Sequence, residues 1–127
     1  MDKKKKCKID TYPVDLYGVD VIVVQSPSFS MLSKRYNIEE EDISQKADAT
    51  TVSGLYNLKT RRPVVMIVMK RWNDKYDLVN TCAHEALHAA TDILIYRGIT
   101  LNHDTSEAYA YLAGWLTECV YKSVTKK

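Results

Sequence analysis

The sequence predicts an α+β domain in which a small mixed sheet packs against two long helices. Three short segments in the first 70 residues are rich in β-branched side chains, as strands are. Two longer segments in the second half repeat their apolar residues at helical spacing. The chain has 127 residues, 46% of them hydrophobic and 27% charged. This size and composition suit one domain, residues 1–127, with a single core.

The first half of the chain begins with the lysine run "KKKKCK", and we predict residues 1–10 to be a basic N-terminal tail. Residues 19–25, "VDVIVVQ", are β-branched and bounded by turn residues on both sides, which predicts a strand. Residues 28–36 then have the pattern of a helix that starts just after a proline. An acidic, polar connection follows this helix.

Two further strands are predicted in the middle of the chain, at residues 50–58, "TTVSGLYNL", and at residues 62–70, "RPVVMIVMK". The short polar stretch "KTRR" joins them, which predicts a hairpin. The second strand is apolar on both faces. We therefore expect it to lie in the centre of the sheet.

A long helix is predicted to begin at Asn73 or Asp74, which can cap it, and to end at Gly98. Apolar residues at helical spacing are expected to form its buried stripe. These are Val79, Ala83, Ala86, Leu87, Ala90, Ile93 and Leu94.

A last helix is predicted to start between residues 104 and 106, where three side chains in succession can cap it. Its residues expected to face the core are Ala108, Leu112, Trp115, Leu116, Cys119 and Val120. The order strand, helix, hairpin, helix, helix is typical of an α+β domain.

Composition and charge narrow the function classes. A formal net charge of +2 does not indicate a nucleic-acid or membrane partner. No secretory signal and no apolar run long enough to span a bilayer is visible, so a cytoplasmic location is expected. Cys7, Cys82 and Cys119 form no CxxC pair, and we expect free thiols in a reducing compartment.

The segment "CAHEALHAA" carries the motif H-E-x-x-H in His84, Glu85 and His88. Residues four apart on a helix project from one face, so both imidazoles can reach one zinc ion. Glu85, beside the first histidine, can hold a zinc-bound water and remove its proton to make a nucleophile. Small alanines around the motif would also allow a second helix to approach closely.

A catalytic zinc ion usually has three protein ligands and one open position. Four residues lie within reach in the sequence. Glu107 lies on the last helix, His103 and Asp104 lie just before it, and Asp92 lies one helical turn beyond His88. Spacing alone does not separate Glu107 from His103.

"HEALH" followed by "SEAYAYLAGWL" resembles the gluzincin arrangement, and more closely the small ImmA/IrrE-like zinc peptidases and related phage metallopeptidases. The matching residues of the second motif are Glu107, Ala108, Ala110 and Tyr111. The resemblance covers roughly residues 50–120. It implies a minimal zincin-like fold, with a hairpin before the active-site helix. It also implies Glu107 as the third ligand, ahead of His103, Asp92 and Asp104.

The resemblance further implies a zinc-dependent metallopeptidase whose peptide or protein substrate lies along the edge hairpin. Tyr111 and Tyr56 are the side chains considered as oxyanion stabilisers. The alternative is a non-catalytic protein that keeps a zinc-organised fold, such as a phage virion or cargo component. The presence of Glu85 favours the enzyme, because a purely structural zinc site has no need of a general base and usually closes with four ligands, mostly cysteines.

Overall fold

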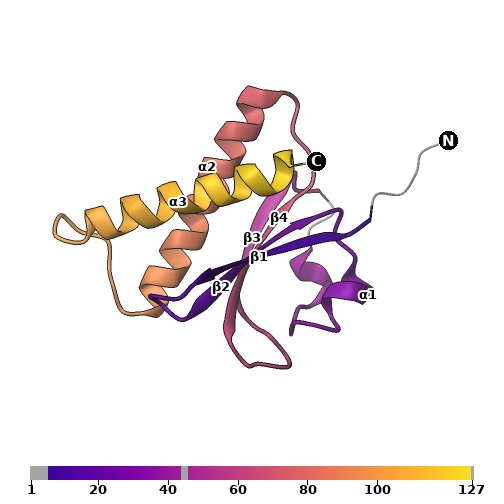
Figure 1. The fold of residues 1–127 in the computed structure, drawn as a ribbon, viewed down its shortest axis with the longest axis horizontal. Coiled ribbons are helices and arrows are strands. Elements are labelled where there is room, and N and C mark those ends of the chain that lie inside the picture. The colour runs from indigo at the N-terminus through magenta and orange to yellow at the C-terminus, as the bar shows by residue number, and fades with distance from the viewer. Residues whose placement is uncertain (1–5, 44–45, 127) are drawn as a thin grey trace.

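The computed structural model describes residues 6–43 and 46–126, and it confirms the predicted α+β fold (Figure 1). A four-stranded sheet forms the middle layer. Two long helices, α2 (Lys75–Tyr96) and α3 (Ser106–Thr125), lie on one face of it. The short helix α1 (Phe29–Leu32) and the segment that follows it cover the other face.

The strands are β1 (Lys8–Val14), β2 (Val19–Gln25), β3 (Ala49–Tyr56) and β4 (Pro63–Met69), in the spatial order β1-β2-β4-β3. The hairpins β1–β2 and β3–β4 are antiparallel, and the central pair β2–β4 is parallel, so the sheet is mixed. The predicted hairpin and the central position of its second strand are confirmed. Its first strand, β3, lies at the edge.

The central strands β2 and β4 are buried on both faces. Val21, Val23 and Ile67 point toward α2 and α3, whereas Ile22 and Met66 point toward α1. Alternate side chains of a strand point to opposite faces, so a strand covered on both sides must be apolar throughout. This requirement explains the unbroken runs "VIVV" and "VVMIVM".

Two predictions for the first half of the chain were wrong. Residues 8–10, assigned to the basic tail, form the start of β1; residues 1–5 lie outside the described residues. As an edge strand, β1 needs apolar side chains on one face only, so its lysine and aspartate residues concealed it. The helix predicted over residues 28–36 is only α1, because Tyr36 pairs with Asn57 in an isolated β-bridge. A short 3₁₀ helix, η1 (Glu40–Asp42), follows.

Both ends of α2 were predicted correctly. The Asp74 side chain caps the N-terminus by accepting a hydrogen bond of 2.8 Å from the Asp77 amide. At the C-terminus, Gly98 has a φ of +77°. The Gly98 amide donates to the Ile95 carbonyl and the Ile99 amide donates to the Leu94 carbonyl, which is the Schellman arrangement. The next helix, α3, begins at Ser106, inside the predicted window.

The predicted buried stripe of α2 was correct in part. Ala86, Ala90, Ile93 and Leu94 are buried, but Val79, Ala83 and Leu87 are exposed. Residues on the neighbouring side of the helix are buried instead: Leu78, Cys82, Glu85 and Ala89. Both sides carry small or apolar residues, so the spacing identified a helix but not the direction in which it faces the sheet.

The same shift affects α3. Leu112, Leu116, Cys119 and Val120 are buried as predicted, whereas Ala108 is only half-buried and Trp115 is 42% exposed. Across the described residues, neither of these helices nor any other combines the length and apolarity needed to cross a membrane.

We predict that Gly98→Ala destabilises the fold by about 1 kcal/mol, because alanine disfavours the left-handed conformation that the end of α2 requires. A Cβ at this position would meet no atom within 4 Å, so strain is the only cost. Urea denaturation measures the change. The matched control is Gly114→Ala on α3, where a Cβ also meets nothing within 4 Å and φ is not positive. That variant should gain about 0.5–1 kcal/mol from helix propensity. Equal effects of the two substitutions would contradict the prediction.

Candidate functional site

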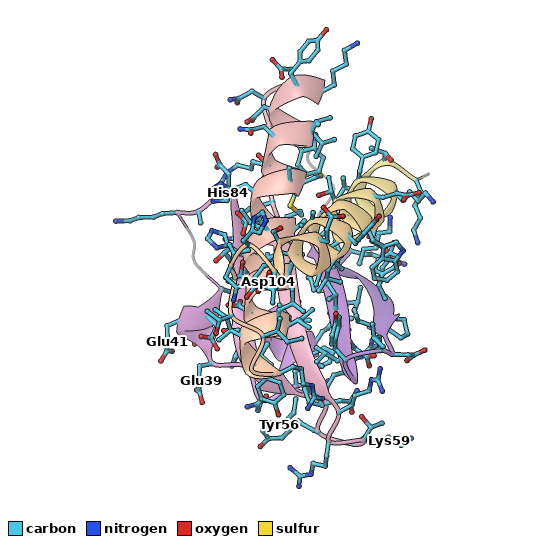
Figure 2. All side chains as sticks on the ribbon, turned by 90° about the vertical axis from the view of Figure 1, so that its left-hand side faces the viewer. Glu39, Glu41, Tyr56, Lys59, His84 and Asp104 are labelled. Atoms are coloured by element: carbon cyan, nitrogen blue, oxygen red, sulfur yellow. The ribbon has the colours of Figure 1, made fainter. Side chains whose placement is uncertain are left out.

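His84 and His88 project from the side of α2 that faces away from the core. Both are exposed, and the His84 side chain is 66% accessible. Their Nε2 atoms lie 3.2 Å apart, with ring centroids 4.8 Å apart and the ring planes at 74°. The i, i+4 spacing therefore produces the paired arrangement that the motif predicted. Figure 2 looks onto this side of the molecule.

The Nε2 separation fits a shared metal ion. Two nitrogens bound to one tetrahedral zinc ion at ~2.05 Å would lie about 3.3 Å from each other. The observed 3.2 Å is close to this value. A hydrogen bond between two neutral imidazoles has a similar length, with one ring donating and the other accepting. The pair is thus a two-ligand chelate or a hydrogen-bonded pair, and metal binding is the property that separates the two.

Glu85 is buried, in contrast to the two histidines, and is only 6% exposed. The Thr51 hydroxyl, on the edge strand β3, donates to Glu85 Oε1 at 2.8 Å and lies 3.2 Å from the Glu85 carbonyl oxygen. Glu85 Oε2 lies 3.9 Å from His84 Nε2. The carboxylate therefore has one oxygen occupied by Thr51 of the sheet and the other 3.9 Å from His84 Nε2.

The residues predicted to supply the third ligand are not brought onto this pair. Within residues 6–43 and 46–126, no group of three or more His, Cys, Asp and Glu side chains is placed to hold a metal ion. Glu107, His103 and Asp104 are all exposed, at the start of α3 and in the loop before it. Figure 2 shows Asp104 on the same face of the molecule as His84. The choice of Glu107 stays a prediction from the sequence resemblance.

Asp92 occupies a different environment from these three exposed residues. It is half-buried and lies one turn beyond His88 on α2. Burial raises the pKa of the Asp92 carboxyl, and the positive charge of a protonated His88 opposes that rise. Asp92 also lines a cavity between α2 and the sheet. It is therefore positioned between the histidine pair and this cavity.

The two tyrosines considered as oxyanion stabilisers lie in different places. Tyr111 is on α3 and is 76% exposed. Tyr56 is at the end of β3, where the Arg61 guanidinium carbon lies 5.4 Å from its ring centroid and where its side chain lines the cavity. Figure 2 shows Tyr56 at the far end of the molecule from His84. Neither position adds support to an oxyanion role.

The two buried cysteines are poor metal ligands in this fold. Cys82 and Cys119 are buried free thiols, and burial raises the pKa of each to about 11. A thiol binds metal as the thiolate, which burial disfavours. Both side chains are buried in the core, as expected for Cys119.

Sequence reasoning missed Thr51 as part of the site. Its hydrogen bond joins residues 34 positions apart in the chain, and threonine is common in strands for other reasons. The sequence therefore carries no signal that distinguishes Thr51 from Thr50. The cavity beside Asp92 was missed for the same reason, since it is lined by residues from three strands and a helix.

Compared with known proteins, the chain matches no family model, no curated protein sequence and no solved structure. The site must therefore be interpreted from its own geometry.

We predict that Thr51→Val destabilises the protein by about 1–3 kcal/mol, because it leaves the buried Glu85 carboxylate without its hydroxyl donor. The two side chains have nearly the same shape, so packing changes little. Chemical denaturation of the purified protein gives the value. Thr50→Val, one residue earlier on the same strand, is the control and should change stability by less than about 0.5 kcal/mol. A Thr51 variant as stable as the wild type would show that the hydrogen bond contributes nothing.

We also predict that the protein binds one zinc ion per chain through His84 and His88. Elemental analysis of protein purified without chelator measures the metal content. His84→Ala and His88→Ala should each lose the metal, because two-ligand chelation is removed. Glu107→Gln should weaken binding more than His103→Ala or Asp92→Asn. A wild-type protein without metal, or a His84 variant with full metal, would contradict the site. Asp104→Asn is measured beside the last three variants, and the largest loss among these four identifies the third ligand.

Proposed function

We propose that the chain is a zinc-dependent peptidase in which Glu85 acts as general base. The observation that carries the proposal is the arrangement of three side chains on α2. Two imidazole Nε2 atoms lie 3.2 Å apart, and the carboxylate between them in sequence is held from behind by Thr51. This places the Glu85 carboxylate beside a pair of potential metal ligands.

The residues present suit zinc in their chemistry. Imidazole and carboxylate are its ordinary ligands at catalytic sites. Zinc bound there would lower the pKa of a bound water and polarise a substrate carbonyl. His84 and His88 would hold the ion, and the sequence resemblance supplies Glu107 as the third ligand.

Glu85 is suited to accept a proton from water. Thr51 fixes Oε1, which leaves Oε2 as the oxygen nearest His84, at 3.9 Å. This separation is too long for a hydrogen bond between Glu85 and the imidazole, so His84 does not occupy Oε2. Because the carboxylate is buried and hydrogen-bonded to a neighbouring strand, its orientation is set before substrate binds.

The edge strand β3 supplies a place for the substrate backbone. Within the described residues it pairs with β4 on one side and has no strand on the other, although its Tyr56 amide donates to Asn37 Oδ1. An extended peptide can add to such an edge by main-chain hydrogen bonds. Thr51 links this strand directly to Glu85, so a peptide on β3 would lie beside the proposed base.

A non-catalytic role is the second candidate, and one observation favours it. In the part of the chain that the structure describes, the third ligand is not assembled around the histidines. A protein of this kind would bind metal weakly or use the exposed histidine pair to contact a partner. It would then have no need of Glu85 as a base.

The substitution Glu85→Gln separates these functions. It keeps the shape of the side chain and can still accept from Thr51, so fold and zinc content should be retained. Peptide hydrolysis should fall by at least ~10²-fold, because the amide cannot accept the proton. Mass spectrometry of a broad peptide library incubated with zinc-loaded protein is the assay. Equal turnover by the wild type and the variant would exclude this mechanism. No turnover by the zinc-loaded wild type would favour the non-catalytic role.

A further inference from the structure

A cavity of about 610 Å³ lies between the C-terminal half of α2 and the hairpin end of the sheet. This volume falls within the range of about 300–1,000 Å³ that ligand-binding pockets occupy. Its floor is apolar, since the lining residues Val19, Val65 and Ile93 are buried side chains of the core on the α2 face of the sheet. Its rim is exposed: Ile95 is 59% accessible. The cavity is therefore an opening into the core that solvent can reach.

The edge strand bends where it passes this cavity. The register of β3 against β4 shifts between Val52 and Leu55, which is a β-bulge. Gly54 within the bulge has a φ of +74°, and a Cβ there would meet no atom within 4 Å. The backbone of β3 is thus open to an approaching ligand at the point where the strand lines the cavity.

Measured along the axis of α2, the cavity lies beyond the histidine pair toward the C-terminus of the helix. The midpoint of His84 and His88 is position 86, and the midpoint of the lining segment Asp92–Tyr96 is position 94. Eight residues of helix span about 12 Å. An extended peptide covers that distance in three or four residues at ~3.3 Å each.

The charges at its two ends differ in sign. Asp92 lines the end nearer the histidines, and Arg61, in the hairpin turn, lines the other end. Within the described residues, Arg62 pairs with Asp15 and Asp20, whereas Arg61 forms no ion pair and instead contacts the ring of Tyr56. Lys59 adds a further positive charge to the same turn. The far end of the cavity therefore complements a negative group.

We propose that this cavity binds an apolar side chain of a peptide substrate, three or four residues from the bond that is cut, with an acidic residue next to it contacting Arg61. The distance of three or four residues from the cleaved bond rests on the proposed peptidase function. The preference for an apolar side chain beside an acidic one rests only on the cavity. An apolar floor excludes a polar occupant, and Asp92 disfavours an acidic group at the near end.

Binding can be tested without catalysis. The probes are blocked alanine hexapeptides with a central Leu-Glu or Glu-Leu pair, which allow for either chain direction. Matched peptides replace the leucine by alanine or the glutamate by lysine. Titration of the ¹⁵N-labelled full chain, followed by NMR, should shift the amides of Leu55, Ile93 and Ile95 with one of the two probes. Removing the leucine side chain should weaken binding by at least about 5-fold.

Variants on the exposed rim test the cavity without disturbing the core. Ile95→Asn should weaken binding of the leucine peptide by at least about 5-fold, because it places an amide at the apolar mouth. Val79→Asn is its control, since Val79 is also a β-branched residue of α2, 49% exposed and outside the cavity. Arg61→Glu should remove the preference for the glutamate peptide over the lysine peptide. We expect this preference to be about 2–5-fold in affinity, because the ion pair with Arg61 is exposed. Lys59→Glu, in the same turn but outside the cavity lining, should change it less.

The outcomes separate this proposal from the proposed function. No binding at millimolar peptide, shifts away from the cavity, or equal effects of Ile95→Asn and Val79→Asn would overturn the cavity proposal. Selective binding without zinc-dependent cleavage by the wild type would overturn the peptidase and leave the cavity as a peptide-binding site. If the wild type cleaves peptides, and neither Ile95→Asn nor the position of the leucine changes the cleavage, the cavity proposal is overturned and the peptidase is retained. Selective binding together with cleavage three or four residues from the leucine would support both.

Discussion

The burial of β2 and β4 on both faces is the constraint on which the rest of this structure depends. Two neighbouring strands with no polar face must be covered on each side by apolar material. The short helix α1 and the segment after it cover one face, and α2 with α3 cover the other. This requirement fixes α2 against the sheet along most of its length. The histidines, the glutamate and the cavity all take their positions from that contact.

The placement of α2 gives its three sides different environments. One side is buried in the core, the opposite side presents His84 and His88 to solvent, and Glu85 lies at the boundary between them. At this boundary a carboxylate can be desolvated and still reach the histidine pair. The Thr51 hydroxyl makes that position tolerable, since a buried carboxylate without a donor would destabilise the fold. Asp92 and the cavity lie farther along the same helix, so α2 joins the proposed chemistry to the proposed recognition.

Much of the fold was predictable because its signals are local. The strands β2, β3 and β4, the capped start of α2 and its glycine stop depend on residues close together in the chain. The basic tail was wrong because β1 takes its stability from pairing with β2, which its own composition does not reveal. The buried stripe of α2 was partly wrong because Val79 and Leu87 are as apolar as the residues that replaced them in the core. Periodicity gives the spacing of a buried stripe, whereas packing selects which of two apolar sides is covered.

By itself, the sequence determined that His84 and His88 share one face of a helix with Glu85 beside them, because the i, i+4 geometry is internal to a single element. Tertiary structure alone decided that Thr51 holds Glu85, that Asp92 opens onto a cavity and that Arg61 stands at its far end. These relations join residues that are tens of positions apart. They depend on strand register and on the rotation of α2 against the sheet, and both are set by the packing of the whole core.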